Sequence, residues 1–301
     1  MSEALRVAAI VGPTAAGKTV LSLELAERMG AEIVSLDSMQ AYRGMDIGTA
    51  KPGPGELGRV PHHMIDVIDP GAEVTVAEFR DRARASIDDI ASRGRLPLLV
   101  GGSGLYFRAV VDDLRFPPRS PDLRVRLETE AGDRGAGALH DRLAGIDPVA
   151  ASRIEPGNVR RTIRALEAIE LTGALFSEFD SSWELYQSLF NLRVVGLRRD
   201  RTELYRRISE RAEEMLAAGL RAEAETLAKR GLSRTARQAL GYRQVLEMPG
   251  APEDEVLAAI VRATKRFARR QEAWFRADPR VLWLDASGPE LLSAAEGHLR
   301  G

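Results

Sequence analysis

The stretch GPTAAGKT, residues 12–19, fits the pattern G-x-x-x-x-G-K-[ST] and decides how the first third of the chain is organised. Before it runs RVAAIV (6–11), a continuous apolar strand typical of a parallel sheet that is buried on both faces. After it, TVLSLELAERM (19–29) has helical apolar spacing and ends before Gly30. Strand, glycine loop and helix in this order predict a phosphate cradle, in which backbone N–H groups and the positive end of the helix dipole meet an anionic oxygen.

The loop residues carry distinct expected roles in such a cradle. Lys18 supplies a positive charge, and the Thr19 hydroxyl is the predicted ligand of Mg²⁺, the expected cofactor. Both are therefore also assigned to catalysis. The predicted diphosphate-binding residues are Gly12, Pro13, Thr14, Ala15, Ala16, Gly17, Lys18 and Thr19.

Two further apolar strands end beside polar or glycine-rich residues. EIVSL (32–36) is followed by Asp37, and LPLLV (96–100) by GGSG (101–104). Ligands of open parallel sheets bind beyond the carboxyl ends of the strands, so both ends should lie beside the glycine loop. With later strands at 192–197 and 281–284, the pattern predicts the α/β class: a P-loop NTPase-like parallel sheet flanked by helices.

The sequence pattern changes after Leu114. RFPPRSPDLR (115–124) interrupts the pattern, and the chain then looks helical to about Phe190, with turn signals at 132–137, 147–148 and 155–158. We therefore predict a P-loop catalytic core, residues 1–114 and 191–301, and a helical insertion domain, residues 115–190. Residues 50–70, rich in proline and glycine and containing His62-His63, are expected to form one long functional loop.

Composition limits the function classes. The chain has 301 residues, 44% hydrophobic and 29% charged, which is ordinary for a globular protein. It has no cysteine, so disulfides and thiolate metal sites are excluded, and its four histidines are too scattered to suggest a zinc cluster. A cytoplasmic location is expected, because neither a signal segment nor a membrane-spanning stretch is apparent. With a net charge of −1, any nucleic-acid surface must come from local clusters of basic residues.

A phosphate cradle alone leaves several functions open. A phosphate-hydrolysing NTPase, a small-molecule kinase, an enzyme whose substrate carries a diphosphate leaving group and a non-catalytic, nucleotide-switched RNA-binding module would all use one. Asp37 at the strand end is equally open, because it can hold Mg²⁺, cap the next element or act as a base.

Five separated motifs narrow the choice. Besides GPTAAGKT, they are DSMQAYRGMDIGTAKP (37–52), LVGGSGLYFRAVV (99–111), RRTIRALE (160–167) and ALGYRQ (239–244). In this order, over about residues 7–285, they resemble the tRNA dimethylallyltransferase family, also called tRNA isopentenyltransferases, and the lack of cysteine fits the shorter bacterial form. The resemblance implies transfer of a dimethylallyl group from dimethylallyl diphosphate to the exocyclic amine of the adenosine 3′-adjacent to the anticodon in tRNA, with release of diphosphate.

The resemblance also implies roles for single residues. Asp37 is the candidate base that removes a proton from the amine, and Ser103 stands where the family usually has threonine. Both are assigned to catalysis. Gln40 has an amide suited to the edge of adenine, and Arg124 matches a position implicated in substrate contact. The residues expected to contact tRNA are Asp37, Ser38, Met39, Gln40, Ser103, Arg124, Arg160, Arg161, Thr162, Ile163 and Arg164.

Two helices offer basic surfaces for the anticodon arm. A helix from Asn158 to Thr172, stopped by Gly173, would place three arginines on one face and apolar residues on another. In the last long helix, six basic residues fall within an arc of about 140°, and Phe267, Trp274 and Phe275 point away from this arc. A solvated helix face is the alternative explanation of such a run.

Tyr42, Tyr106 and Tyr242 are interpreted as packing residues. The expected partners are the tRNA anticodon arm and dimethylallyl diphosphate, with the protein a monomer. The six basic residues of the last long helix are Arg262, Lys265, Arg266, Arg269, Arg270 and Arg276.

Overall fold

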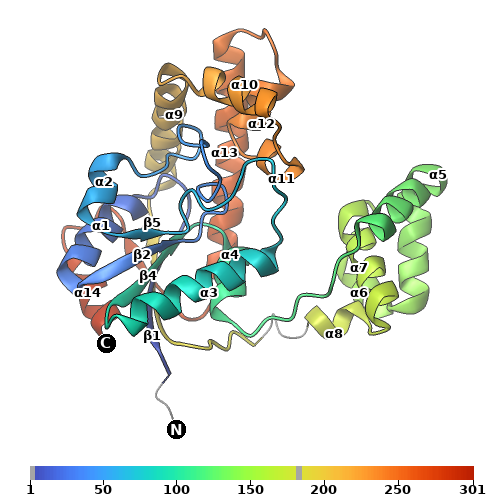
Figure 1. Cartoon of the computed structure of the whole chain (residues 1–301), viewed down its shortest axis with the longest axis horizontal. Coiled ribbons are helices and arrows are strands. Elements are labelled where there is room, and N and C mark those ends of the chain that lie inside the picture. Colours follow the sequence, from blue (N-terminus) through green and yellow to red (C-terminus); the bar gives the residue numbers. More distant parts are fainter. Residues whose placement is uncertain (1–3, 181–184) are drawn as a thin grey trace. The chain divides into compact units, whose positions relative to one another are not determined.

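A six-stranded parallel sheet organises the larger part of the chain (Figure 1). The computed structural model describes residues 4–180 and 185–301. The strand order is β3-β2-β4-β1-β5-β6, and each pair of neighbouring strands is parallel. The strands are β1 (Arg6–Val11), β2 (Ala31–Ser35), β3 (His62–His63), β4 (Leu96–Gly101), β5 (Asn191–Arg198) and β6 (Val281–Asp285).

The central strand β1 explains why its sequence is apolar throughout. It lies between β4 and β5, so both of its edges are hydrogen-bonded. Its side chains alternate between two cores: Val7, Ala9 and Val11 belong to one cluster, and Ala8 and Ile10 to the other. A strand buried on both faces has no solvent side on which polar residues would be favoured.

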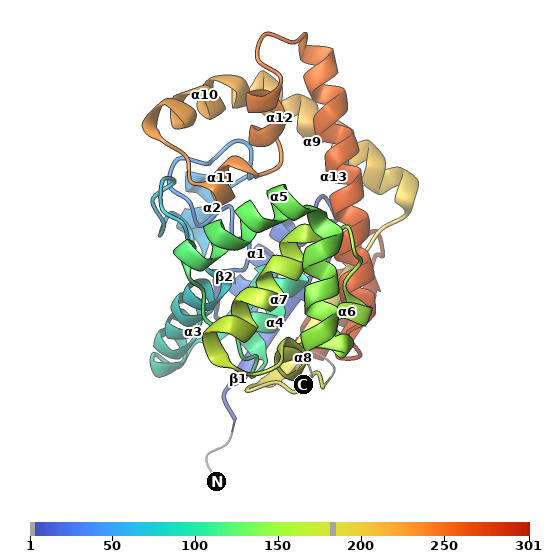
Figure 2. The same ribbon diagram turned by 90° about the vertical axis from the view of Figure 1, so that its right-hand side faces the viewer.

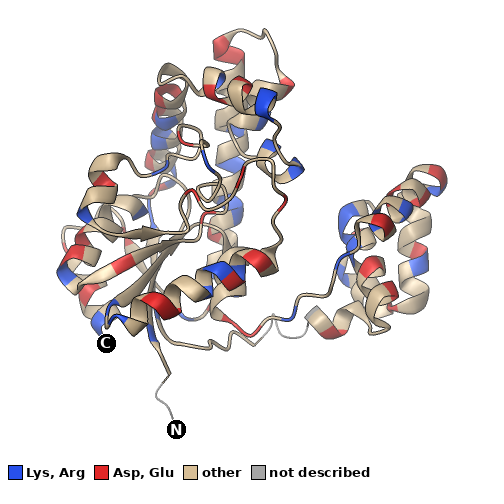
Figure 3. Cartoon of the chain, in the orientation of Figure 1, with Lys and Arg blue, Asp and Glu red and all other residues tan. Residues whose placement is uncertain are grey.

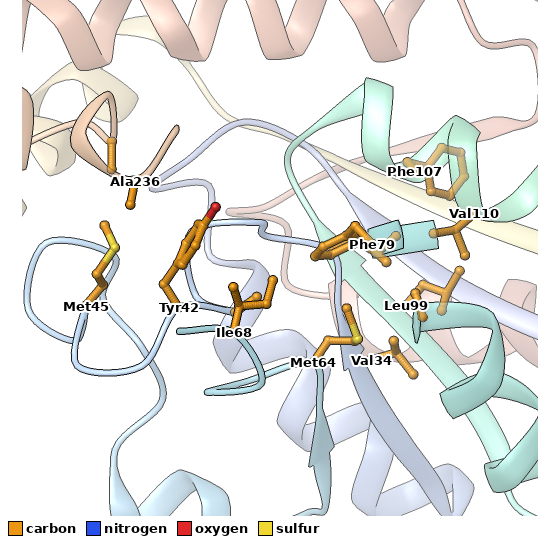
Figure 4. Packing of buried hydrophobic residues seen from close by; sticks show 14 of the residues in the cluster. Val34, Tyr42, Met45, Met64, Ile68, Phe79, Leu99, Phe107, Val110 and Ala236 are labelled. Carbon is orange, nitrogen blue, oxygen red and sulfur yellow. The ribbon is translucent and has the colours of Figure 1, made fainter. Parts of the chain in front are cut away.

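Helices cover both faces of this sheet. The first cluster packs β1, β2 and β4 against α3 and α4, where Val34, Leu99, Phe79 and Phe107 meet (Figure 4). The second cluster packs the other face against α1 and α14. The helices of this unit are α1 (Lys18–Met29), α2 (Pro54–Arg59), α3 (Val76–Ser92), α4 (Gly104–Val111), α9 (Arg201–Ala217), α10 (Leu220–Arg230), α11 (Arg234–Arg237), α12 (Tyr242–Glu247), α13 (Glu253–Arg276) and α14 (Leu291–Arg300).

A second, all-helical unit interrupts the first. The chain divides into Met1–Asp112 with Ser188–Gly301, and Asp113–Gln187. In the second unit, seen face-on in Figure 2, α5 and α7 pack around Leu127, Leu139 and Leu166. Its helices are α5 (Pro121–Ile146), α6 (Pro148–Arg153), α7 (Val159–Thr172) and α8 (Phe176–Asp180).

The predicted turns and stops lie at real breaks in the helices. The 132–137 signal coincides with a kink in α5, where Gly135 has φ 82°. Gly173 follows α7 with φ 72°, a left-handed conformation that glycine adopts without strain. The prediction for residues 50–70 was wrong in part, because this segment contains α2 and the edge strand β3 rather than loop alone. A two-residue strand is too short for any periodicity to reveal.

Candidate active site

The phosphate loop leaves the carboxyl end of β1 and runs into α1, as the motif predicts. Lys18 folds back over the loop, and its Nζ donates to the carbonyl oxygens of Gly12 at 2.9 Å and Pro13 at 2.7 Å. Gly12 has φ 138°, and a Cβ there would lie 2.7 Å from the carbonyl oxygen of Leu197 on β5. Only glycine lets the loop pass this close to the neighbouring strand.

One cavity of about 390 Å³ opens beside this loop. The predicted meeting of three strand ends is confirmed, because Lys18, Asp37 and Gly102 all line it. Further walls come from the 40–52 segment, α9 and α13. Its lining residues are Thr14, Ala15, Gly17, Lys18, Thr19, Val20, Ser22, Ile33, Ser35, Asp37, Gln40, Thr49, Ala50, Pro52, His62, Val100, Gly101, Gly102, Arg207, Glu210, Arg211, Glu214, Phe267 and Gln271.

The backbone around Asp37 is held by short-range hydrogen bonds. Its Oδ1 accepts from the N–H of Met39 at 3.0 Å, and its own N–H donates to Ser35 Oγ at 3.3 Å. The carboxylate thus sits at a tight turn just past β2 and lines the cavity. A carboxylate fixed in such a cleft can accept a proton from a bound group.

The electrostatics of the cavity centre on Lys18. Burial, and then the nearby positive charge of Arg211, lower the pKa of its ammonium to about 8, while the charge of Asp37 opposes this shift. Burial also lowers the pKa of Arg211. The lining carries three cationic side chains, Lys18, Arg207 and Arg211, and three carboxylates, Asp37, Glu210 and Glu214. A bound anion beside Lys18 would relieve its repulsion with Arg211, so this part of the cavity favours a phosphate group.

Two arginines of α9 were missed by the sequence interpretation. Arg207 Nε donates to the carbonyl oxygen of Ala15 at 3.0 Å, and Arg211 reaches the carbonyl oxygen of Thr49 at 3.5 Å. Both line the cavity, one against the phosphate loop and one against the opposite wall. They stand four residues apart on one helix face, but that spacing is common on solvated helices and carries no specific signal.

Gln271 of α13 was also missed. Its Oε1 accepts from the N–H of Thr14 at 2.9 Å, which ties α13 to the phosphate loop. A Cβ on Gly102 would lie 2.2 Å from its Nε2. One turn further on, a Cβ on Gly104 would lie 1.7 Å from Cδ1 of Trp274. Gly102 and Gly104 are therefore required by the close approach of α13, whereas a Cβ on Gly101 would lie 2.8 Å from Cβ of Leu36.

Ser103 occupies a different place from its neighbours in GGSG. It is the residue before α4, and its carbonyl oxygen accepts from the N–H of Phe107 at 2.9 Å. Gly101 and Gly102 line the cavity, whereas Ser103 is not among the lining residues. Its assignment to catalysis and to tRNA contact stays a prediction.

Of the other residues in the 37–40 segment, Gln40 is the most constrained. Its Nε2 donates to the carbonyl oxygens of Thr49 at 3.2 Å and Ala50 at 3.3 Å, and its Oε1 accepts from Ser35 Oγ at 2.9 Å. Its amide is thus engaged within the protein. Met39 packs against the core, and Ser38 is half-buried.

In the insertion unit, the predicted tRNA contacts differ in exposure. Arg160 and Arg161 are exposed, whereas Thr162 and Ile163 are buried, with exposed fractions of 0% and 2%. The side chains of Thr162 and Ile163 therefore face the helical core and present no surface to RNA. The helical pattern of apolar residues did not predict the burial of Thr162, because this residue lies between an arginine and an isoleucine at the edge of the apolar stripe.

Arg124 and Arg164 share an acidic partner inside that unit. Arg164 donates to Glu167 at 2.9 Å and to the carbonyl oxygen of Pro118 at 2.8 Å, and Arg124 lies 3.7 Å from the same carboxylate. Burial lowers the pKa of Arg164. Arg164 thus braces the segment that enters the unit, whereas Arg124 pairs with carboxylates of α5 and α7.

Figure 3 shows Lys and Arg residues along α13. Arg262, Arg266, Arg269 and Arg270 are exposed, and Lys265 lies over the ring of Tyr205 at 5.0 Å. Trp274, which was expected to point away from the basic residues, packs against Gly104 of α4 and is 44% exposed.

The donor set of the cavity fits a hard divalent cation held mainly by phosphate. Thr19, which carries a hydroxyl, lines the cavity, and so does Asp37, the carboxylate beyond β2. Within residues 4–180 and 185–301, no group of three or more acidic, histidine or cysteine side chains is arranged to hold a metal on its own. Mg²⁺ commonly binds in this way, through one or two protein oxygens, substrate phosphates and water.

The histidine pair lies on β3 and is not arranged as a metal site. His63 Nε2 lies 2.8 Å from Glu32 Oε2, and His62 Nδ1 lies 2.7 Å from the carbonyl oxygen of Val60. Burial lowers the pKa of His62, which lines the cavity. The pair mainly anchors the edge strand.

Comparison with known proteins places this geometry in a family. A family model described as IPP transferase matches residues 40–278, more than half of the chain. The chain belongs to this family of transferases. The tRNA dimethylallyltransferase of Streptomyces avermitilis is 50% identical over 95% of this chain and 92% of its own length, and that of Streptomyces coelicolor is 52% identical over 93% and 90%. The family that the five motifs indicated is thus confirmed.

Solved structures agree with the fold. The full-length tRNA isopentenylpyrophosphate transferase of Bacillus halodurans is 41% identical, covers 98% of this chain and 97% of its own, and has a TM-score of 0.71. A eukaryotic dimethylallyltransferase acting on tRNA is 24% identical, with a TM-score of 0.82 over 97% of this chain and 77% of that one, and shares the fold. Among the described helices, none is long and apolar enough to cross a membrane.

Proposed function

We propose that this chain transfers the dimethylallyl group of dimethylallyl diphosphate to the exocyclic amine of the adenosine 3′-adjacent to the anticodon in tRNA. The observation that carries the proposal is the shared cavity of the phosphate loop and Asp37, in a chain whose relatives are named tRNA dimethylallyltransferases. A loop built for diphosphate and a carboxylate built to take a proton are the two groups that this substitution needs.

The bond changes follow from these two groups. The bond between the allylic carbon and the diphosphate oxygen breaks, and the amine nitrogen forms the new bond to that carbon. Lys18, Arg207, Arg211 and the loop amides stabilise the charge on the departing diphosphate. The exocyclic amine is a weak nucleophile, because its lone pair is delocalised into the ring, so the Asp37 carboxylate accepts its proton as the new bond forms.

The proposed Mg²⁺ would be held by the Thr19 hydroxyl and the diphosphate oxygens, where it would supply further charge neutralisation. Thr19 lies in the first turn of α1, where the positive end of the helix dipole also favours an anion. The test compares T19A with T19S over a range of Mg²⁺ concentrations. T19A should need a higher concentration for half-maximal rate, whereas T19S should behave as the wild type.

We assign the grip on the anticodon arm to the exposed basic residues of α13 and to Arg160 and Arg161 of α7. The target base must leave its stack to reach the cavity, so these contacts hold the backbone while the base is extruded. We expect the reaction to take place in the cytoplasm, together with its tRNA substrate. We further propose that the chain acts on its tRNA substrate as a monomer.

The proposal is tested with labelled donors and unmodified tRNA. Label should pass to RNA from dimethylallyl diphosphate and not from the γ-phosphate of ATP. Transfer from ATP to a small molecule would support a kinase instead, and RNA binding without any transfer would support a nucleotide-switched binding module.

A further inference from the structure

A half-buried carboxylate on α10 gathers four hydrogen-bond donors outside the catalytic cavity. Glu223 accepts from three consecutive backbone N–H groups, those of Asp46 at 3.2 Å, Ile47 at 3.0 Å and Gly48 at 3.4 Å. It also accepts from the hydroxyl of Tyr242 at 2.5 Å. Hydrogen bonds to a charged acceptor are about twice as strong as neutral ones, so this carboxylate fixes the tip of the 37–52 segment.

Tyr242 completes the anchor and gives the ALGYRQ motif a physical reason. Its hydroxyl accepts from the N–H of Gly48 at 3.2 Å while donating to Glu223. Its ring is fully buried, and a Cβ on Gly48 would lie 2.3 Å from Cε2 of that ring. Gln244 accepts from the N–H of Gly241 at 2.9 Å and fixes the start of α12, which carries the tyrosine.

The anchored tip continues directly into the cavity wall. Thr49 and Ala50 line the cavity, and their carbonyl oxygens accept from Gln40 Nε2. Gln40 Oε1 accepts from Ser35 Oγ, and Ser35 Oγ in turn accepts from the N–H of Asp37. Covalent and hydrogen-bonded links therefore run without a gap from Glu223 to the backbone of the candidate base.

We propose that Glu223 and Tyr242 are positioning residues that hold the 46–50 wall and, through Gln40 and Ser35, the backbone of Asp37. The inference rests on the proposed function, because its effect on chemistry requires Asp37 to be the base. Neither residue lines the cavity, so neither touches substrate. The phosphate loop has separate anchors in Lys18, Arg207 and Gln271, so diphosphate binding should not depend on this pair.

The base of the same segment is packed independently, so loosening the tip should leave the fold intact. Tyr42 and Met45 are buried, and Figure 4 shows them beside Ala236 of α11. In E223Q an amide NH₂ replaces one acceptor oxygen and faces backbone N–H groups with a donor. In Y242F the ring remains, and only the hydroxyl that links Gly48 to Glu223 is lost.

The experiment compares wild type, E223Q, Y242F and E225Q in the full chain. Glu225 is exposed on the same helix and serves as the matched control. Three readouts are taken: hydrogen exchange of a peptide covering residues 44–52, the Kd of inorganic diphosphate, and kcat and KM for tRNA prenylation. E223Q should lower kcat by about 10- to 100-fold, because misplacement of a reacting group by about 1 Å costs up to this much. Y242F should follow in the same direction with a smaller loss.

In both variants exchange at 44–52 should become faster, while the Kd of diphosphate stays within about twofold of wild type and E225Q changes nothing. Faster exchange with unchanged kcat would overturn the positioning role. Unchanged exchange would overturn the anchor itself, and this readout holds whether or not the chain prenylates tRNA. If E223Q does not fold, Y242F decides by the same criteria. A wild-type chain that binds diphosphate but transfers nothing would instead count against the proposed function.

Discussion

The side chain of Gln271 accepts a hydrogen bond from the backbone N–H of Thr14 at 2.9 Å, across 257 residues of sequence. Thr14 is part of the phosphate loop, and Gln271 belongs to α13, the helix that carries the exposed basic residues. The proposed diphosphate site and the proposed RNA surface are therefore joined by one buried amide. Gln271 is 6% exposed, so its partner cannot readily be replaced by water.

Replacing Gln271 with glutamate tests this junction. The new carboxylate can still accept from Thr14 but places a negative charge beside the phosphate loop. We expect the Kd of inorganic diphosphate to rise about tenfold, because like charges a few ångströms apart in a partly buried site repel by more than ~1 kcal/mol. Q238E makes the same change at an exposed position outside the cavity and should leave the Kd unaltered. Equal affinity of Q271E and wild type would show that this residue does not border the diphosphate.

Asp37 should be needed for the chemical step more than for binding. D37N keeps the size of the side chain and removes its basicity, so we expect kcat to fall by about 10²- to 10⁴-fold. The Kd of diphosphate should change little. D88N, at an exposed position on α3, is the control. Single-turnover rates at saturating tRNA and donor measure the effect, and a near wild-type rate for D37N would remove Asp37 as the base.

Lys18 should make stability depend on pH in a defined direction. Its pKa is about 8 in the folded chain against 10.5 as the ordinary value, so between these limits the unfolded state binds more protons. The free energy of unfolding of wild type should therefore rise relative to K18M as pH increases. Between pH 7.5 and 9.5 we expect a relative gain of roughly 1 to 2 kcal/mol. Denaturant unfolding of both proteins at both pH values measures it. A constant difference would mean that the folded pKa is not lowered.

The exposed basic residues of α13 should make the affinity for tRNA fall as the salt concentration rises. If Arg266 and Arg269 contact phosphates, each contact releases about 0.7 to 0.9 counterions. The R266Q/R269Q variant should therefore lower the slope of log K against log salt for tRNA by roughly 1.4 to 1.8. R300Q on α14 should leave the slope unchanged. Fluorescence anisotropy with a labelled anticodon arm provides the measurement, and an unaltered slope in the double variant would exclude this part of α13 from the interface.

The sequence was informative where function depends on residues close together in the chain. The phosphate loop could be read because glycine, lysine and threonine must follow one another between a strand and a helix. Asp37 and GGSG could be placed beside it because strand ends in a parallel sheet share one edge. The insertion could be outlined because proline and glycine mark where a helical segment begins and breaks.

The rest depends on contacts that sequence spacing does not encode. Arg207, Arg211 and Gln271 reach the cavity from helices that follow the insertion, and nothing in their local sequence separates them from solvated helix residues. Glu223 holds three backbone groups of a segment far earlier in the chain.

The most direct test of the central claim is a crystal structure of the chain with inorganic diphosphate and an unmodified anticodon stem-loop. We predict diphosphate within the 12–19 loop and the exocyclic amine of the extruded adenine about 2.6 to 3.2 Å from the Asp37 carboxylate. Diphosphate bound elsewhere, or a base held out of reach of Asp37 and on another face of the molecule, would contradict the account.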